Sequence, residues 1–169
     1  MNSIRIWGAL LLLISTYYST KAQSHQWANN VTSSSKLLPV PTSLSLDSNN
    51  NIYQLVRFID TLKIESKYCY SNKSDFSFCL NKSNKNGKNI WMQLILTNSS
   101  TSPNTNNLRV NNLVVVNSNK ILIYGTFSAG ILYIGLNDSI QNSKNKQVGF
   151  IAEMDSNGRC KFLNKIFET

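Results

Sequence analysis

The residues able to do chemistry are few in this chain and widely spaced. There is one histidine, His25, and there are three cysteines, Cys69, Cys79 and Cys160. A Ser-His-Asp or Cys-His device needs a histidine held beside its nucleophile, and His25 lies in a polar stretch close to the amino terminus. A zinc site needs about four ligands, which these four scattered residues do not offer. The sequence therefore predicts no catalytic residue, no metal ligand and no cofactor, and a protein that is not an enzyme.

Eight carboxylates are spread along the chain. Acidic pairs that cleave glycosidic bonds come together only in the fold, so a secreted hydrolase is an alternative, with Asp60 and Glu65 as its first candidates. Asp47 begins a sequence, Asp-Ser-Asn-Asn-Asn, that is similar to the start of a calcium-binding loop. It lacks the glycine and the later acidic residue that such a loop requires. We therefore expect hairpin turns here and at Asp155-Ser156-Asn157-Gly158.

The three cysteines are better explained as structural. An exported chain enters an oxidising compartment, where one disulfide and one remaining thiol are expected of three cysteines. We predict the Cys69–Cys79 disulfide, which closes the shortest loop and would tie a hairpin. Cys79–Cys160 and Cys69–Cys160 are the alternatives, and the sequence alone does not decide among the three.

Export is indicated by residues 1–22, which have the pattern of a cleaved signal peptide. Arg5 precedes an apolar run from Ile6 to Ile14, and Thr20-Lys21-Ala22 places small residues where signal peptidase needs them. That run is too short to span a bilayer, which takes about 20 residues. We expect cleavage after Ala22 and a secreted, extracellular chain with no integral membrane span. An uncleaved signal anchor is the alternative.

Five Asn-x-Ser/Thr sequons follow the signal peptide, and each is a permissive acceptor pattern for an N-linked glycan. Most of them lie in stretches typical of turns, so we expect some to carry glycans in a eukaryotic secretory pathway. The acceptor residues are Asn30, Asn72, Asn81, Asn98 and Asn137.

The chain is basic, with a formal net charge of +9, or +7 once Arg5 and Lys21 leave with the signal peptide. Its lysines are separated by polar loop residues and do not stack on one helix face, so we expect no nucleic-acid partner. Net charge bears on solubility before it bears on a partner. We expect a solvated surface, with docking on acidic glycans or membrane surfaces as an alternative.

The elements that position these residues are predicted to be strands. Short β-branched and aromatic runs alternate with Asn, Asp, Ser and Gly, which is typical of strands and hairpins. No window has the 3.6-residue apolar period of a helix. We therefore predict an all-β protein with no long helix after the signal peptide. The expected strands include residues 52–58, 90–96, 113–116, 121–127, 131–134, 148–152 and 160–163.

The two halves of the mature chain repeat one order of elements: a strand, an Asn-rich turn, a strand ending in an aromatic residue, a loop, a strand, an Asn-Gly turn and an aromatic residue. Phe58 corresponds to Phe127, and Trp91 to Phe162. Both Asn-Gly dipeptides suit hairpin turns with a positive φ. We predict an extended N-terminal segment at 23–40, a first β repeat at 41–96, a Ser/Thr/Asn-rich linker at 97–107 and a second β repeat at 108–169.

The stretches from Trp27 to Trp91 and from Trp91 to Phe162 resemble the SBBP-type β-propeller repeat. The shared pattern is apolar-x-apolar-Asp-Ser-Asn-Asn-Asn-Ile-Tyr, then Phe, then a strand with Asp-Ser-Asn-Gly and an aromatic residue. The resemblance implies that each copy forms a propeller blade whose Asp-Ser-x-Gly-Asn turn joins two strands. Asn50 stands where that family has Gly, and the second copy departs from the pattern at Asn119-Lys120.

Two copies are too few to close a propeller, which takes roughly 4–8 blades. The alternatives are two antiparallel blade-like sheets packed together, a ring completed by self-association, or a divergent fragment of a longer ancestor. We predict the packed pair, because two sheets that each have one apolar face can bury those faces against one another. The expected core consists of Leu55, Phe58, Trp91, Tyr124, Phe127, Ile134, Phe150 and Phe162.

Trp27, Trp91 and the Tyr68-Cys69-Tyr70 triplet offer an aromatic platform for a glycan or a protein partner. Aromatic residues in strands are more often core, and Tyr68 and Tyr70, in a loop-like stretch, are the ones most expected to be exposed. The predicted function is that of a secreted, glycosylated β-repeat protein that acts as a binding or structural module, with self-association as one way of acting.

Overall fold

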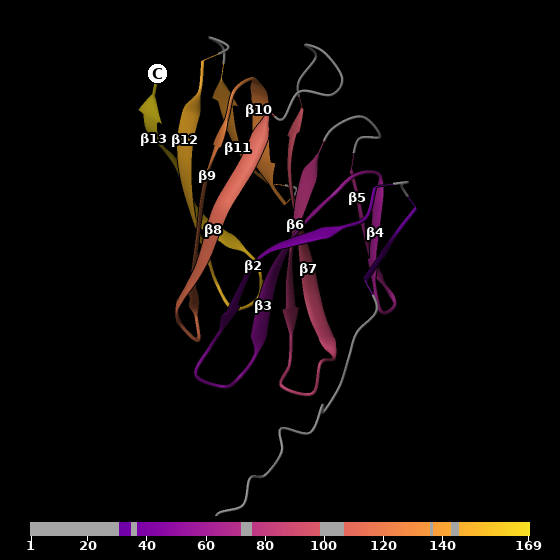
Figure 1. Ribbon diagram of the computed structural model, residues 1–169. Coiled ribbons are helices and arrows are strands. Elements are labelled where there is room, and N and C mark those ends of the chain that lie inside the picture. The colour runs from indigo at the N-terminus through magenta and orange to yellow at the C-terminus, as the bar shows by residue number, and fades with distance from the viewer. Residues whose placement is uncertain (1–30, 35–36, 72–75, 99–106, 136, 143–145) are drawn as a thin grey trace, which may run out of the picture.

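The computed structural model describes residues 31–34, 37–71, 76–98, 107–135, 137–142 and 146–169. This part of the chain contains thirteen strands and no helix, so the all-β prediction is confirmed. The strands form three antiparallel sheets, which lie as layers from left to right in Figure 1. No helix that could cross a lipid bilayer occurs within these ranges.

Four strands from the first half of the chain belong to the central, six-stranded sheet. They are β2 (Val40–Leu46), β3 (Ile52–Phe58), β6 (Ser77–Ser83) and β7 (Asn89–Asn98). Each pairs antiparallel with the next one in chain order. They fall within or at the edge of the segment predicted as the first repeat, except that β7 continues two residues into the predicted linker.

The second half of the chain repeats this arrangement. β8 (Leu108–Asn117), β9 (Lys120–Phe127), β12 (Val148–Met154) and β13 (Cys160–Glu168) form a four-stranded sheet, again paired in chain order. The repeated order of elements in the sequence therefore corresponds to two sets of four sequential antiparallel strands. The two sheets pack together as predicted.

Each set has a hairpin inserted between its second and third strands, and the two hairpins dock differently. β4 (Thr61–Ile64) and β5 (Lys67–Tyr70) join β1 (Val31–Ser33) in a separate three-stranded sheet, shown at the right of Figure 1. β10 (Gly130–Ile134) and β11 (Asp138–Asn142) instead extend the central sheet, because β10 pairs with the end of β7. The sheets are thus not divided as the two halves of the sequence are. The unpaired backbone groups at the edge of β7 explain this docking.

Asx turns close the predicted hairpins. Oδ1 of Asp47 accepts hydrogen bonds from the backbone N–H groups two and four residues later, both at 2.9 Å. Asp155 does the same at 2.9 and 3.0 Å, so both hairpin-turn predictions are confirmed. Asn50 has φ of 60° and Gly158 has φ of 79°. Asn50 therefore takes a left-handed conformation that asparagine tolerates better than most residues with a side chain.

The main core lies between the central and four-stranded sheets. The rings of Phe127 and Phe150 meet edge to face there, with centroids 6.3 Å apart. Leu55 and Ile134 are also buried in it, as predicted. Phe58 is buried too, but in a second core between the central and three-stranded sheets. The members of this second core are Val56, Phe58, Leu62, Ile64, Cys69 and Cys79.

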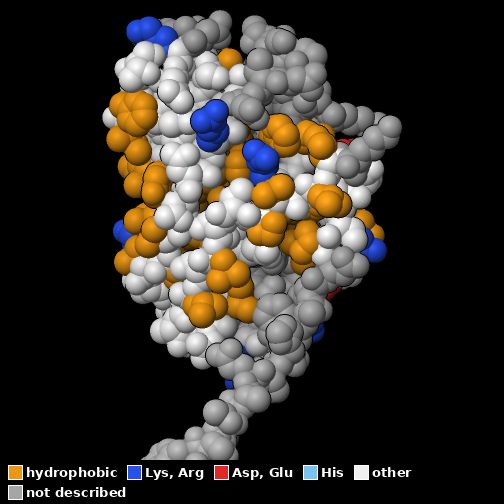
Figure 2. All heavy atoms as spheres, in the orientation of Figure 1, with side chains coloured by type: hydrophobic (Ala, Val, Ile, Leu, Met, Phe, Trp, Pro, Cys, Tyr) orange, Lys and Arg blue, Asp and Glu red, His pale blue; other side chains and the backbone are white. Residues whose placement is uncertain are grey.

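Two predicted core residues are not buried, and those assignments were wrong. Tyr124 is 39 % exposed and Phe162 is 50 % exposed. Successive residues of a strand face opposite sides, so burial of Ile123 turns Tyr124 outward. Phe162 pairs with Glu153 and lies on the same outer face. Trp91 is only partly buried against the core. Figure 2 shows hydrophobic side chains along the left margin, on the side of the four-stranded sheet.

Candidate functional site

Two tyrosines stand exposed on β5. Tyr68 and Tyr70 alternate with the buried Cys69, so both face outward, and they are 48 % and 64 % exposed. Their rings lie 10° from parallel with centroids 6.1 Å apart. Nζ of Lys63 lies 5.5 Å from the centre of the Tyr68 ring. The predicted exposure is confirmed, although the residues lie in a strand rather than in a loop.

The tyrosines border a groove of about 410 Å³ whose opposite wall is β7. Met92, Gln93 and Leu94 form that wall, and Gly135 closes it. The groove exists because β10 pairs only with residues 95–98 of β7, and the chain then turns away at Gly135. Trp91 does not join this platform, because its Nε1 donates to the carbonyl of Ser156, at 2.8 Å, in the β12–β13 turn. Trp27 lies outside the described residues.

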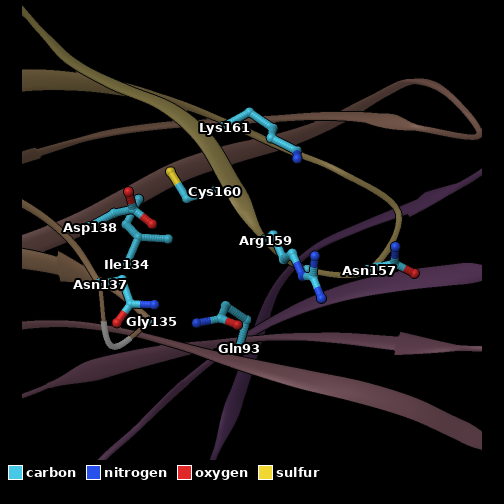
Figure 3. Close-up of a pocket in the computed structure, with 10 residues that line it drawn as sticks. Gln93, Ile134, Gly135, Asn137, Asp138, Asn157, Arg159, Cys160 and Lys161 are labelled. Atoms are coloured by element: carbon cyan, nitrogen blue, oxygen red, sulfur yellow. The ribbon is translucent and has the colours of Figure 1, made fainter.

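A second hollow, of about 510 Å³, adjoins the groove and shares Gln93 and Gly135 with it. In Figure 3 the amides of Asn137 and Gln93 face each other, and the carboxylate of Asp138 lies beside Cys160. We call this hollow the polar pocket. Its other lining residues are Ile134, Asn157, Gly158, Arg159 and Lys161.

Gln93 holds together the two turns that form the polar pocket. In the orientation that satisfies its neighbours, its amide nitrogen donates to the carbonyl of Gly158, at 3.1 Å. Its amide oxygen accepts from the N–H of Gly135, at 2.9 Å. A Cβ atom at position 135 would lie 2.1 Å from the end of the Gln93 amide, and φ is 70° there, so only glycine fits.

The β12–β13 turn is also held by a side chain of the central sheet, Lys82 on β6. Nζ of Lys82 donates to the carbonyl of Ser156, at 3.1 Å, and lies 5.1 Å from the centre of the Tyr53 ring. Burial lowers the pKa of Lys82, although the negative charge of Asp47 acts in the opposite direction. These contacts position the backbone that carries Asn157 and Arg159.

The polar pocket offers hydrogen-bonding groups that the protein leaves open. The side chains of Asn137, Asn157 and Arg159 have no hydrogen bond to other residues in the described part of the chain. Burial, together with the charge of Asp138, raises the pKa of Cys160 to about 11. Since the thiolate is the reactive form, Cys160 is a poor nucleophile at neutral pH. The pocket suits binding of a polar ligand.

The first carboxylate candidates are not brought together. Asp60 and Glu65 lie at opposite ends of β4, so their Cα atoms are about 16 Å apart at the rise of an extended strand. Glycosidase pairs are roughly 5–9.5 Å apart. Oδ2 of Asp60 accepts from Ser34, at 2.8 Å, and Oε2 of Glu65 accepts from the N–H of Asn89, at 3.0 Å. The Asp60 carboxylate therefore fixes the segment after β1, and the Glu65 carboxylate fixes the start of β7.

The predicted cysteine pair is brought together. Sγ of Cys69 and Sγ of Cys79 are free thiols 2.9 Å apart, both buried in the second core, so the disulfide itself stays a prediction. Burial and the neighbouring Cys69 raise the pKa of the Cys79 thiol well above its usual value. The two residues lie on β5 and β6, so their bond would join the three-stranded sheet to the central sheet and not tie one hairpin. Cys160 packs against the main core instead.

The sequons differ in accessibility. Asn98 and Asn137 are exposed, whereas Asn30 and Asn72, like His25, lie outside the described residues. Asn81 is 3 % exposed, and its Nδ2 donates to Oγ of Ser83, at 3.2 Å. A glycan on Asn81 does not fit this fold.

A group of three or more His, Cys, Asp or Glu side chains able to hold a metal ion does not occur in the described ranges. The fold and site define a β-sandwich, built on two repeated sets of four sequential strands, with a tyrosine groove and a polar pocket on one flank. Comparison of the chain with protein-family models, curated proteins and solved structures gives no match. The resemblance to SBBP-type repeats therefore rests on the sequence pattern alone.

Proposed function

We propose that this chain is an exported, N-glycosylated β-sandwich module that binds a glycan without transforming it, in the groove beside Tyr68 and Tyr70. The observation that carries the proposal is the exposure of both tyrosines, 48 % and 64 %, with nearly parallel rings. Aromatic side chains on strands are ordinarily buried. Two exposed neighbours that border a groove therefore indicate a surface for a ligand.

The chemistry of the groove suits a sugar ring. A tyrosine combines a broad apolar face with a polar tip, so it can pack on the C–H face of a pyranose and also bond its hydroxyl groups. The wall formed by Met92 and Leu94 is apolar, and the ammonium of Lys63 is close to Tyr68. Ligand sites combine an apolar lining with a few placed polar groups in this way.

Binding without catalysis is favoured by the placement of the carboxylates. The two first candidates, Asp60 and Glu65, are held apart by β4 and bond to Ser34 and Asn89. In the polar pocket, the raised pKa of Cys160 keeps its thiol protonated at neutral pH. A hydrolase would need a different pair of acidic groups.

Docking on acidic glycans through net charge is the competing mode of binding. On the face shown in Figure 2, the Lys and Arg side chains are scattered singly. Interactions between exposed charges are screened by salt, whereas stacking on tyrosine is not. Binding that persists in 0.5 M salt, roughly a 4 Å screening length, would support the tyrosine groove.

The test compares the wild-type chain with the double variant Tyr68→Ala/Tyr70→Ala on an array of immobilised glycans. We expect the double variant to bind about 30-fold or more weakly, the effect of losing a binding hot spot of about 2 kcal/mol. Tyr124→Ala is the matched control, since it removes a 39 % exposed strand tyrosine from the far layer. It should bind like the wild type.

Two outcomes would contradict the proposal. One is equal binding by the wild type and the double variant. The other is a wild-type chain that binds no glycan on the array. If such a chain formed a defined oligomer in solution, the structural-module alternative would be favoured instead.

A further inference from the structure

The polar pocket has an N-glycosylation acceptor in its wall. Asn137 is exposed, begins the sequon Asn137-Asp138-Ser139 and lies between β10 and β11. Figure 3 shows its amide turned into the pocket, toward Gln93. A sugar attached to Nδ2 of Asn137 would therefore begin inside the pocket and not in open solvent.

The pocket has room for such a sugar. Its volume of about 510 Å³ lies within the range of pockets that hold small ligands. Gly135 and Gly158 are part of its wall, and the places that their side chains would take are occupied by Gln93 and by the ring of Trp91, which fix both turns. The contacts of Gln93 with both turns keep this space open.

The pocket also has the chemistry that a sugar requires. Arg159 and Asn157 place a guanidinium and an amide in the wall, and neither side chain bonds to another described residue. Asp138 supplies a carboxylate acceptor. Hydroxyl and N-acetyl groups can accept from the guanidinium and amide donors and donate to the carboxylate. Lys161 is partly engaged, since its Nζ lies 3.4 Å from Oδ2 of Asp155.

We infer that the polar pocket seats the first N-acetylglucosamine of a glycan carried by Asn137, so that the chain supplies the pocket's own occupant. Attachment forms a bond between Nδ2 of Asn137 and C1 of the sugar. The nitrogen loses one proton, and the lipid pyrophosphate that carried the oligosaccharide leaves. The inference rests on the predicted export and goes beyond the glycan bound in the tyrosine groove.

The test uses peptide N-glycanase, which hydrolyses the Cγ–Nδ2 amide bond of a glycosylated asparagine and leaves an aspartate. The secreted protein is treated while folded and after denaturation, and release is followed at each sequon by mass spectrometry. In the folded protein we expect release at Asn137 to be about tenfold slower than at Asn98, equivalent to about 1.4 kcal/mol of protection. Asn98 is the matched site, because it is exposed and lines neither hollow. After denaturation the two rates should be equal.

Two variants separate a seated sugar from general crowding. Arg159→Ala removes one wall group and should raise the native release rate at Asn137 toward that at Asn98. Arg109→Ala, which removes an exposed arginine from β8, should change neither rate. Equal native rates at Asn137 and Asn98 in the wild type would overturn the inference, as would secreted protein with Asn137 unmodified.

The readout is independent of the proposed ligand. The variant Tyr68→Ala/Tyr70→Ala should keep the slow release at Asn137, since neither tyrosine lines the polar pocket. A negative result for glycan binding in the tyrosine groove would therefore not contradict the seated sugar on Asn137, and the reverse also holds.

Discussion

A disulfide between Cys69 and Cys79 should add measurably to the free energy of unfolding of this protein. The two sulfur atoms lie 2.9 Å apart and ten residues apart in the chain. Closing a loop of that size removes unfolded-state entropy worth about 3 kcal/mol. A domain of this kind has roughly 5–15 kcal/mol of stability in all. For a chain of about 150 residues, loss of the bond should lower Tm by about 6–12 °C.

The assay has two parts. Alkylation of the secreted protein in denaturant should label one cysteine, Cys160, and leave Cys69 and Cys79 joined. Urea unfolding with a phosphine reductant should then give a free energy of unfolding about 3 kcal/mol lower than without it. The double variant Cys69→Ala/Cys79→Ala should be insensitive to the reductant. Cys160→Ala, the control, should respond to it as the wild type does.

Three labelled cysteines in the secreted protein would refute this reasoning, as would equal stability with and without reductant. A bond from Cys160 to either partner would show that the second core is wrongly placed, because Cys160 belongs to the main core. The bond must also form early. Burial raises the pKa of the Cys79 thiol, so few thiolates would be present for exchange once the chain has folded.

The remaining predictions test the packing, the pocket, the turns and export. Phe150→Ala should cost about 3–5 kcal/mol of stability in urea unfolding, whereas Phe162→Ala should cost at most about 1 kcal/mol because half its surface is already in water; equal losses would contradict the inward and outward assignments. At pH 8, Cys160 of the folded protein should react with a disulfide reagent roughly 100-fold more slowly than an ordinary thiol, because its pKa is raised; an ordinary rate would exclude that burial. Burial raises the pKa of Asp47, but hydrogen bonds from Asn51, Asn49 and Tyr53 outweigh it and lower the pKa. That stabilisation is present above the unfolded pKa of about 3.9 and is lost as pH falls through the lower folded value, so between pH 5 and pH 2 Asp47→Asn should lose less stability than the wild type. Sequencing of secreted protein should begin at or within a few residues of Gln23, and an intact Met1 would rule out cleavage.

The strand pattern and the repeat could be predicted from the sequence because both depend on local signals. Strand β3 occupies the predicted residues 52–58, and β9 starts one residue before the predicted 121–127. The Asp-Ser-Asn turns predicted hairpins because an aspartate at such a position satisfies two backbone N–H groups. Which face of each strand points to the core could be predicted less well from the sequence. Tyr124 and Phe162 are large and aromatic, yet the alternation of their strands points them outward.

The polar pocket could not be predicted in the same way. Gln93 gains its role only because the β10–β11 and β12–β13 turns, more than forty residues later, meet on either side of it. No composition or spacing near Gln93 marks this. The one local signal was Gly135, an isolated glycine at the end of a strand pattern, which is typical of close backbone approach. The exposure of Tyr68 and Tyr70 was predicted from a loop-like stretch, whereas in the structure it follows from alternation with the buried Cys69 in strand β5.

The candidate site arises from an asymmetry between two otherwise equivalent halves. Both four-stranded sets have a hairpin at the same point, but β4–β5 covers the face of the central sheet while β10–β11 extends its edge. Because β10 reaches only residues 95–98 of β7, the preceding stretch of β7 is left without a strand partner on that side. β5, with its exposed tyrosines, borders this stretch in the groove, and the β12–β13 turn meets it in the polar pocket. If β10–β11 covered a sheet face as β4–β5 does, β10 would not pair with β7, and Gly135 would line neither the groove nor the polar pocket. The groove and the pocket are therefore consequences of how the second hairpin docks, which depends on tertiary contacts that the repeated sequence pattern does not encode.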